Sequence, residues 1–132
     1  MTKNKVSLSG LSRCVLAFAF VSIGALHFIN PQVFCKIVPS FIPWVKEVVY
    51  ISGLAEIAGG IGLLISALRN AAVWGLILLL LAVFPANINM ALHPEIFPAI
   101  PIWILYLRLP LQALIIFWVW SCRIKSPEKL DS

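Results

Sequence analysis

The chain has 132 residues, of which 61% are hydrophobic and 11% are charged, and its formal net charge is +5. Soluble domains are about half apolar and a quarter charged, so this composition excludes an ordinary soluble domain and indicates an integral membrane protein. The Lys and Arg residues form no cluster on a polar face, so the positive charge does not indicate nucleic-acid binding. At this length a single domain, residues 1–132, is expected.

Four apolar runs are each long enough to cross a bilayer as a helix. They are residues 11–28, 48–67, 71–92 and 101–122. Between the first two, residues 32–46 contain Lys36, Pro39 and Pro43, which are incompatible with a spanning helix. The predicted fold is therefore an all-α, integral membrane four-helix bundle, with a short interfacial helix or loop between its first two helices that closes over the outer mouth.

The Lys and Arg residues also predict an orientation. The first tail, the second turn with Arg69 and the last tail share one side of the predicted bundle, whereas the other side has only Lys36 and Lys46. The side richer in Lys and Arg normally faces the cytoplasm. Both termini are therefore expected in the cytoplasm, in the cell membrane if the protein is bacterial.

The cysteines indicate neither a redox dithiol nor a metal centre. Cys14, Cys35 and Cys122 are far apart, and no Cys or His stands at the spacing of a zinc site. Only Cys35 falls on the predicted outer side. We expect Cys35 to react with a membrane-impermeant thiol reagent and the other two not to react.

The second span carries a carboxylate, Glu56, well inside its apolar run. A charged side chain at such a depth costs about 2.5–3.5 kcal/mol on insertion scales, so it is normally paired or functional. Helical spacing places Ser52, Gly53, Gly59 and Gly60 around Glu56. A face of such small residues lets a neighbouring helix approach closely or leaves a hollow beside the acid.

Polar residues of the other spans fall at a similar depth. At ~1.5 Å per residue, Glu56 lies roughly 12 Å and Arg108 roughly 10 Å below the outer ends of their spans. Asn89 lies about 200° around the helix from Asn87 and cannot point to the same centre. The candidate ligand-binding residues are therefore those that share this outer layer: His27, Glu56, Asn87, Arg108 and Gln112. No catalytic or metal-binding residue is predicted.

Two interpretations of this layer remain open. Glu56 and Arg108 are predicted to touch directly or through one water, either as a structural ion pair or as part of a binding pocket. If they pair, Arg108→Ala should be severe, because it would leave the carboxylate buried alone. Pro85 and Pro110 should release the carbonyls of residues 81 and 106 close to this layer.

Four segments resemble the DoxX family of small four-helix membrane proteins. They are ALHFINP (residues 25–31), GLAEIAGGIGLL (53–64), VFPANINMAL (83–92) and RLPLQ (108–112). The resemblance places the five candidate residues on family motif positions. It implies a relation to the DoxD subunit of thiosulfate:quinone oxidoreductase, or to membrane assemblies that respond to redox stress, or to an assembly chaperone.

Three functions follow as hypotheses. The first is a small-molecule or quinone-binding membrane subunit of an oxidoreductase assembly, non-catalytic by itself, with soluble oxidoreductase subunits as partners. The second is a small transporter or proton-coupled permease, which at four helices would need to form a homo-oligomer. The third is a structural or chaperone protein whose polar layer only holds the bundle together. Quinone is the one cofactor considered, and the lipid bilayer is the partner common to all three.

Overall fold

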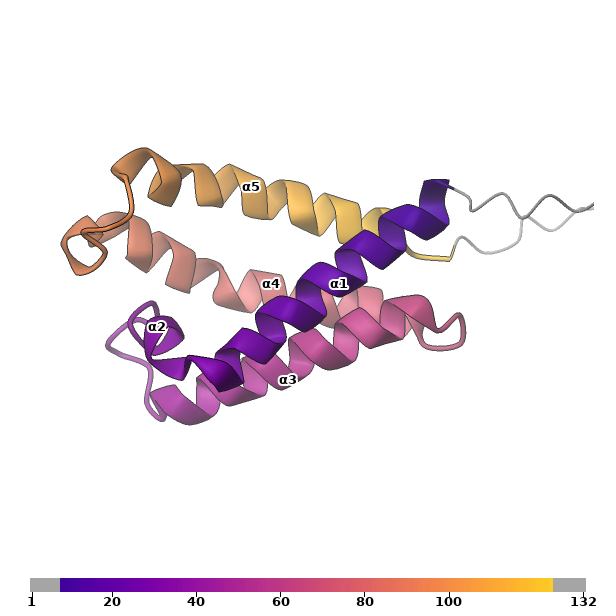
Figure 1. Ribbon diagram of the computed structural model, residues 1–132, viewed down its shortest axis with the longest axis horizontal. Coiled ribbons are helices and arrows are strands. Elements are labelled where there is room, and N and C mark those ends of the chain that lie inside the picture. The colour runs from indigo at the N-terminus through magenta and orange to yellow at the C-terminus, as the bar shows by residue number, and fades with distance from the viewer. Residues whose placement is uncertain (1–7, 125–132) are drawn as a thin grey trace, which may run out of the picture.

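The computed structural model describes residues 8–124, and this part of the chain is helical without strands (Figure 1). The elements are α1 (Leu8–Ile29), α2 (Pro31–Cys35), α3 (Val45–Leu64), α4 (Arg69–Leu92), the 3-10 helix η1 (Pro94–Ile96) and α5 (Ile102–Ser121). The predicted all-α bundle is confirmed. The tail residues Lys3, Lys5, Lys125 and Lys129, on which the predicted orientation partly rests, lie outside the described residues.

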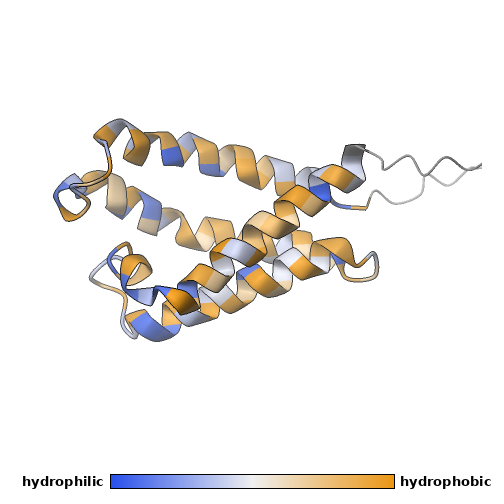
Figure 2. Cartoon of the chain, viewed as in Figure 1, coloured by the Kyte–Doolittle hydropathy of each residue, from blue (hydrophilic) through white to orange (hydrophobic). Residues whose placement is uncertain are grey.

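Four helices, α1, α3, α4 and α5, are long and apolar enough to cross a membrane. Figure 2 shows apolar residues along most of their length, with hydrophilic residues at the loops and at a few positions within the helices. The chain is therefore a multi-pass membrane protein in contact with a lipid bilayer. The start of α1 and the end of α5 lie at one end of the bundle, and α2 and η1 lie at the other (Figure 1). We call these the terminal end and the α2 end.

The second span differs most from its predicted bounds. It occupies Val45–Leu64 and not residues 48–67, because residues 65–68 form the turn to α4. The backbone N–H of Ile65 donates to Gly62 O, and that of Leu68 donates to Ile65 O. Arg69, predicted as part of the turn, begins α4, and its Nε donates to Leu63 O at 2.8 Å.

The segment between α1 and α3 does not span. Residues 31–44 contain one helix, α2, which has five residues. It begins at Pro31, and the first position of a helix needs no backbone N–H because that group has no partner within the helix. Trp44 then adopts a left-handed conformation with φ 53° directly before α3. We refer to residues 31–44 as the α2 segment.

Each long helix packs along the next long helix in the sequence. The pairs are α1–α3, α3–α4 and α4–α5. Glycines allow α1 and α3 to approach closely: a Cβ on Gly53 would lie 2.6 Å from His27 Cβ, and a Cβ on Gly24 would lie 2.7 Å from Gly53 O. Gly62 faces Ala72 of α4 instead, so the small-residue face of α3 is divided between two neighbours.

The apolar core consists of two clusters. The larger one lies toward the terminal end and draws from all four long helices. The smaller one contains Ile37, Met90, Phe97 and Leu105, with no residue of α1 or α3. In Figure 1 the α1–α3 pair and α5 accordingly diverge toward the α2 end. The members of the larger cluster are Leu16, Phe20, Leu63, Val73, Leu76, Ile77, Leu80, Val119 and Cys122.

Candidate functional site

A cavity of about 370 Å³ lies among the four long helices and the α2 segment. This volume is within the range of small-molecule sites, about 300–1,000 Å³. Most of its lining is apolar, including Phe34 and Ile37 of the α2 segment and Trp118 of α5. The five residues selected from the sequence all line it: His27, Glu56, Asn87, Arg108 and Gln112.

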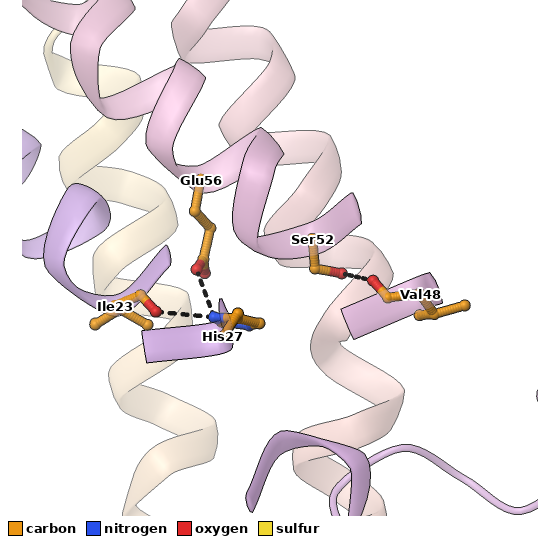
Figure 3. Close-up of polar contacts among 5 residues, drawn as sticks. All are labelled: Ile23, His27, Val48, Ser52 and Glu56. Carbon is orange, nitrogen blue, oxygen red and sulfur yellow. Dashed lines mark hydrogen bonds and ion pairs between the residues drawn. The ribbon is translucent and has the colours of Figure 1, made fainter. Parts of the chain in front are cut away.

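His27 and Glu56 form the polar group on the α1–α3 side of the cavity (Figure 3). His27 Nδ1 lies 2.8 Å from Ile23 O and 3.4 Å from Glu56 Oε2. A carbonyl oxygen only accepts hydrogen bonds, so Nδ1 carries a hydrogen and donates it to Ile23. Glu56 Oε2 is thus left buried with an imidazole nearby but with no hydrogen-bond donor among the described residues.

The surroundings of this pair include side chains of α2 and α3. The Phe34 ring of the α2 segment stacks on the His27 imidazole, with ring centroids 3.8 Å apart and an interplanar angle of 19°. Ser52, which also lines the cavity, turns its hydroxyl to Val48 O of its own helix at 2.8 Å, as Figure 3 shows. The serine therefore leaves Glu56 without a donor.

Asn87, Gln112 and Arg108 form the polar group on the α4–α5 side. Asn87 Nδ2 donates to Gln112 Oε1, and Gln112 Nε2 donates to Leu80 O. Arg108 Nη2 donates to Asn87 Oδ1 at 3.3 Å, and Nη1 points to Met90 Sδ at 3.1 Å. Gln112 is only 4% exposed, so a fully buried amide fixes this group in place.

The direct contact predicted between Glu56 and Arg108 does not form. Among the described residues the basic side chain within 4 Å of the Glu56 carboxylate is that of His27, not that of Arg108. The physical reason is the order of the helices: α3 packs on α1 and α4, whereas α5 packs on α4. Glu56 and Arg108 are therefore at similar depth but on different sides of the cavity. The expected severity of Arg108→Ala loses its basis, because Arg108 does not neutralise Glu56.

Arg108 has no acidic partner within the described part of the chain. Its guanidinium has five N–H donors, and the contacts given above engage only an amide oxygen and a thioether sulfur. Arginines within membrane spans normally pair with acids, carbonyls or bound ligands. The cavity thus contains a half-buried cation whose charge no described residue balances.

Neither proline interrupts its helix, since α4 continues through Pro85 and α5 through Pro110. The carbonyl that receives a side-chain hydrogen bond near Pro85 is that of Leu80, one residue before the predicted one. Gln112 provides that bond from α5. The bond thus joins α5 to the α4 backbone one residue before the carbonyl that Pro85 leaves without its helical donor.

Other residues take roles that the sequence did not assign. Asn89 does not line the cavity and donates through Nδ2 to Ile37 O at 3.2 Å, which attaches the α2 segment to α4. Phe34 and Met90 contact the candidate residues, yet neither was selected. Met90 follows Asn87 by three positions and so shares its helix face, and this spacing could have identified Met90 from the sequence. No signal in the sequence relates Phe34 to His27.

Within residues 8–124 no group of His, Cys, Asp and Glu could hold a metal ion.

A family model matches residues 16–123 of the chain. That family is described as a domain of unknown function, DUF8561. The resemblance to DoxX is therefore wrong: short motifs of small and polar residues between apolar runs were too unspecific to identify a family. No curated protein and no solved structure matches the chain.

Proposed function

The chain belongs to the DUF8561 family, whose function is unknown, and we propose from its cavity that it is a membrane protein that binds a small molecule with an anionic or carbonyl oxygen. The observation that carries the proposal is Arg108, a half-buried guanidinium in a ligand-sized cavity without an acidic partner among the described residues. An oxygen of the ligand would accept from the unused N–H groups of Arg108.

Glu56 supports the same proposal from the other side of the cavity. Its Oε2 is buried and lacks a hydrogen-bond donor, which is an unfavourable state for a carboxylate oxygen. A hydroxyl or amine of a bound molecule would supply that donor. The polar groups thus fit a ligand that accepts at one point and donates at another, within an otherwise apolar cavity.

Quinone remains a candidate ligand, because its ring is apolar and its carbonyl oxygens accept hydrogen bonds. An oxidoreductase assembly, by contrast, was expected only from the resemblance to DoxX and is not part of the proposal. A homo-oligomer and a soluble partner remain predictions.

A structural role is the second candidate. The Asn87–Gln112–Arg108 group joins α4 to α5 by hydrogen bonds, which is what a purely structural layer would do. The two functions differ in what happens when the charge alone is removed. If the group is structural, removing the charge lowers the free energy of unfolding. If it is a binding site, removing the charge lowers the affinity for the ligand.

The test uses the full chain in lipid nanodiscs and two probes without a long chain, 1-naphthoate and menadione. Wild-type protein should bind naphthoate saturably, and Arg108→Gln should weaken that binding by about tenfold or more, equivalent to ~1.4 kcal/mol. Arg123→Gln is the matched control, because Arg123 stacks on Trp120 outside the cavity. Equal binding by wild type and Arg108→Gln, or a loss of stability with no loss of binding, would favour the structural role. Menadione binding would show that a neutral carbonyl suffices.

Cytoplasmic termini belong to the proposal as well. Arg13, Arg69 and Arg123 are near the terminal end, against Lys36 and Lys46 near the α2 end. The test is Thr2→Cys and Ser132→Cys, each in a background without the native cysteines, probed in intact cells with an impermeant maleimide. Neither should be labelled before the membrane is permeabilised; labelling of either one in intact cells contradicts the orientation.

A further inference from the structure

The cavity is longer than its polar groups require. Trp118 lines it ten residues after Arg108 on α5, which is about 15 Å along the helix axis. On α1 the lining extends from His27 through Ile23, Phe20 and Ala19 to Leu16, a similar distance. Below the polar groups, therefore, the cavity continues as an apolar slot between α1 and α5.

The slot exists because α1 and α5 do not pack along their length. The packed pairs are α1–α3, α3–α4 and α4–α5, and a hydrogen bond of 2.6 Å from Trp118 Nε1 to Ser12 Oγ joins α1 to α5 near the terminal end. This bond closes the slot at the terminal end. Side chains from both helices line the slot, and the two helices separate toward the α2 end (Figure 1).

The side wall of the slot opens to the bilayer. Ile23 of α1 and Leu111 of α5 line the cavity, yet they are 44% and 47% exposed. Both are on spans that face lipid. At the α2 end, in contrast, Phe34 stacks on His27 and Asn89 binds the α2 segment, so this end is covered. A ligand that enters between α1 and α5 comes from the membrane and not from water.

We propose that the ligand is a membrane-borne, single-chain carboxylate, with its head at Arg108 and its chain in the slot between α1 and α5. The inference rests on the proposed function and names the class of ligand. Charge selects a carboxylate, because Arg108 lacks an acidic partner among the described residues. Depth selects a small head, because Arg108 is six residues, about 9 Å, below the start of α5, deeper than a phospholipid headgroup lies.

The experiment separates the chain from the head. Full-length protein in nanodiscs is titrated with cis-parinaric acid, a long-chain carboxylate whose fluorescence rises in apolar sites, and with 1-naphthoate, which has no chain. The slot is filled by Ala19→Phe on α1 or, independently, by Ile115→Phe on α5. Ala113→Phe is the matched control, because Ala113 is exposed on α5 and does not line the cavity.

We expect parinarate to bind wild type more tightly than naphthoate does, and each slot variant to weaken parinarate by about tenfold while leaving naphthoate within about twofold. The control should change neither. The inference is overturned if parinarate binds both slot variants as tightly as wild type, or if it binds wild type no more tightly than naphthoate does. The proposed function stands in either case. If neither probe binds wild type, both fail. Tighter binding of a long-chain quinone than of parinarate would overturn the carboxylate assignment.

Discussion

All four long helices contribute side chains to the apolar cluster of the terminal half, whereas only α4 and α5 among them contribute to the cluster of the α2 half. The first half is closed around fully buried residues such as Leu63 and Leu76. The second half holds the polar part of the cavity, with the His27–Glu56 pair on one side and the Asn87–Arg108–Gln112 group on the other. Packing in one half thus allows unpaired polarity in the other, because the bundle does not depend on the polar groups for closure.

This difference predicts that the two halves respond differently to substitution. Changes in the terminal half should reduce the free energy of unfolding, and changes around the cavity should reduce ligand affinity. The following experiments either strengthen this separation or remove it.

The largest effect is expected from Leu76→Ala. Leu76 is 0% exposed in the cluster that joins all four helices. Truncating a buried leucine leaves a cavity and costs about 2–5 kcal/mol. Denaturant unfolding in detergent measures the loss, with Leu78→Ala, at a 66% exposed position of the same helix, as control. Naphthoate affinity of the folded fraction should be unchanged. A Leu76→Ala protein that keeps its stability but loses binding would reverse the assignment of the two halves.

Gly53→Ala should have the next largest effect. The added Cβ would lie 2.6 Å from His27 Cβ and 2.9 Å from Gly24 O, so α1 and α3 must separate beside the cavity. Overpacking of this kind costs about 1–3 kcal/mol. The control is Gly75→Ala, which meets nothing within 4 Å. That control should leave stability unchanged or raise it by up to ~1 kcal/mol through helix propensity. Equal responses of the two variants would show that close approach of α1 and α3 is unimportant.

Asn87→Leu should act mainly on binding. It removes the hydrogen bonds to Gln112 and Arg108, and such interhelical bonds contribute about 0.6–1.7 kcal/mol to membrane-protein stability. Arg108 loses the amide that orients it, so naphthoate affinity should fall by about tenfold, or ~1.4 kcal/mol. Asn70→Leu, at the terminal end, serves as the control. A loss of stability without a loss of affinity would make the amide structural only.

The smallest effect is expected for Asn89→Ala, which detaches the α2 segment from α4 by removing the bond to Ile37 O. Loss of a hydrogen bond of ~1 kcal/mol raises the population of molecules with a detached α2 segment about fivefold. Cys35, half-buried in the α2 segment, should therefore react about fivefold faster with an impermeant thiol reagent. Labelling of the buried Cys122 should not change. An unchanged rate at Cys35 would mean that the α2 segment is held by its other contacts.

Hydropathy and helical rise were sufficient for the fold and for five polar residues that line the cavity. They predicted four spans and placed polar residues from each of them at one depth, and the structure brings those residues to one cavity. The bounds of the second span were displaced by three residues at each end. Its helix begins earlier because its first turn includes the charged residues Lys46 and Glu47, which the apolar run left out, and it ends earlier because the apolar residues Ile65 and Ala67 gave no turn signal.

Pairing within the layer could not be predicted from depth. Whether Glu56 meets Arg108 or His27 depends on which helices are neighbours, and a single sequence with four similar apolar runs does not specify that order. The contact of Phe34 with His27 likewise depends on how the α2 segment folds back, which its three prolines leave undetermined. Depth is a property of one helix, whereas contacts belong to pairs of helices.

The packing of each span on its successor also bears on how the protein is made. Because α1 packs on α3, α3 on α4 and α4 on α5, each span can dock on the one synthesised just before it. The Gly24–Gly53 contact can form while the second half of the chain is still on the ribosome. The hydrogen bond between Ser12 and Trp118 joins the first and last spans, so it can form only after α5 has been synthesised. Assembly thus ends where the slot closes.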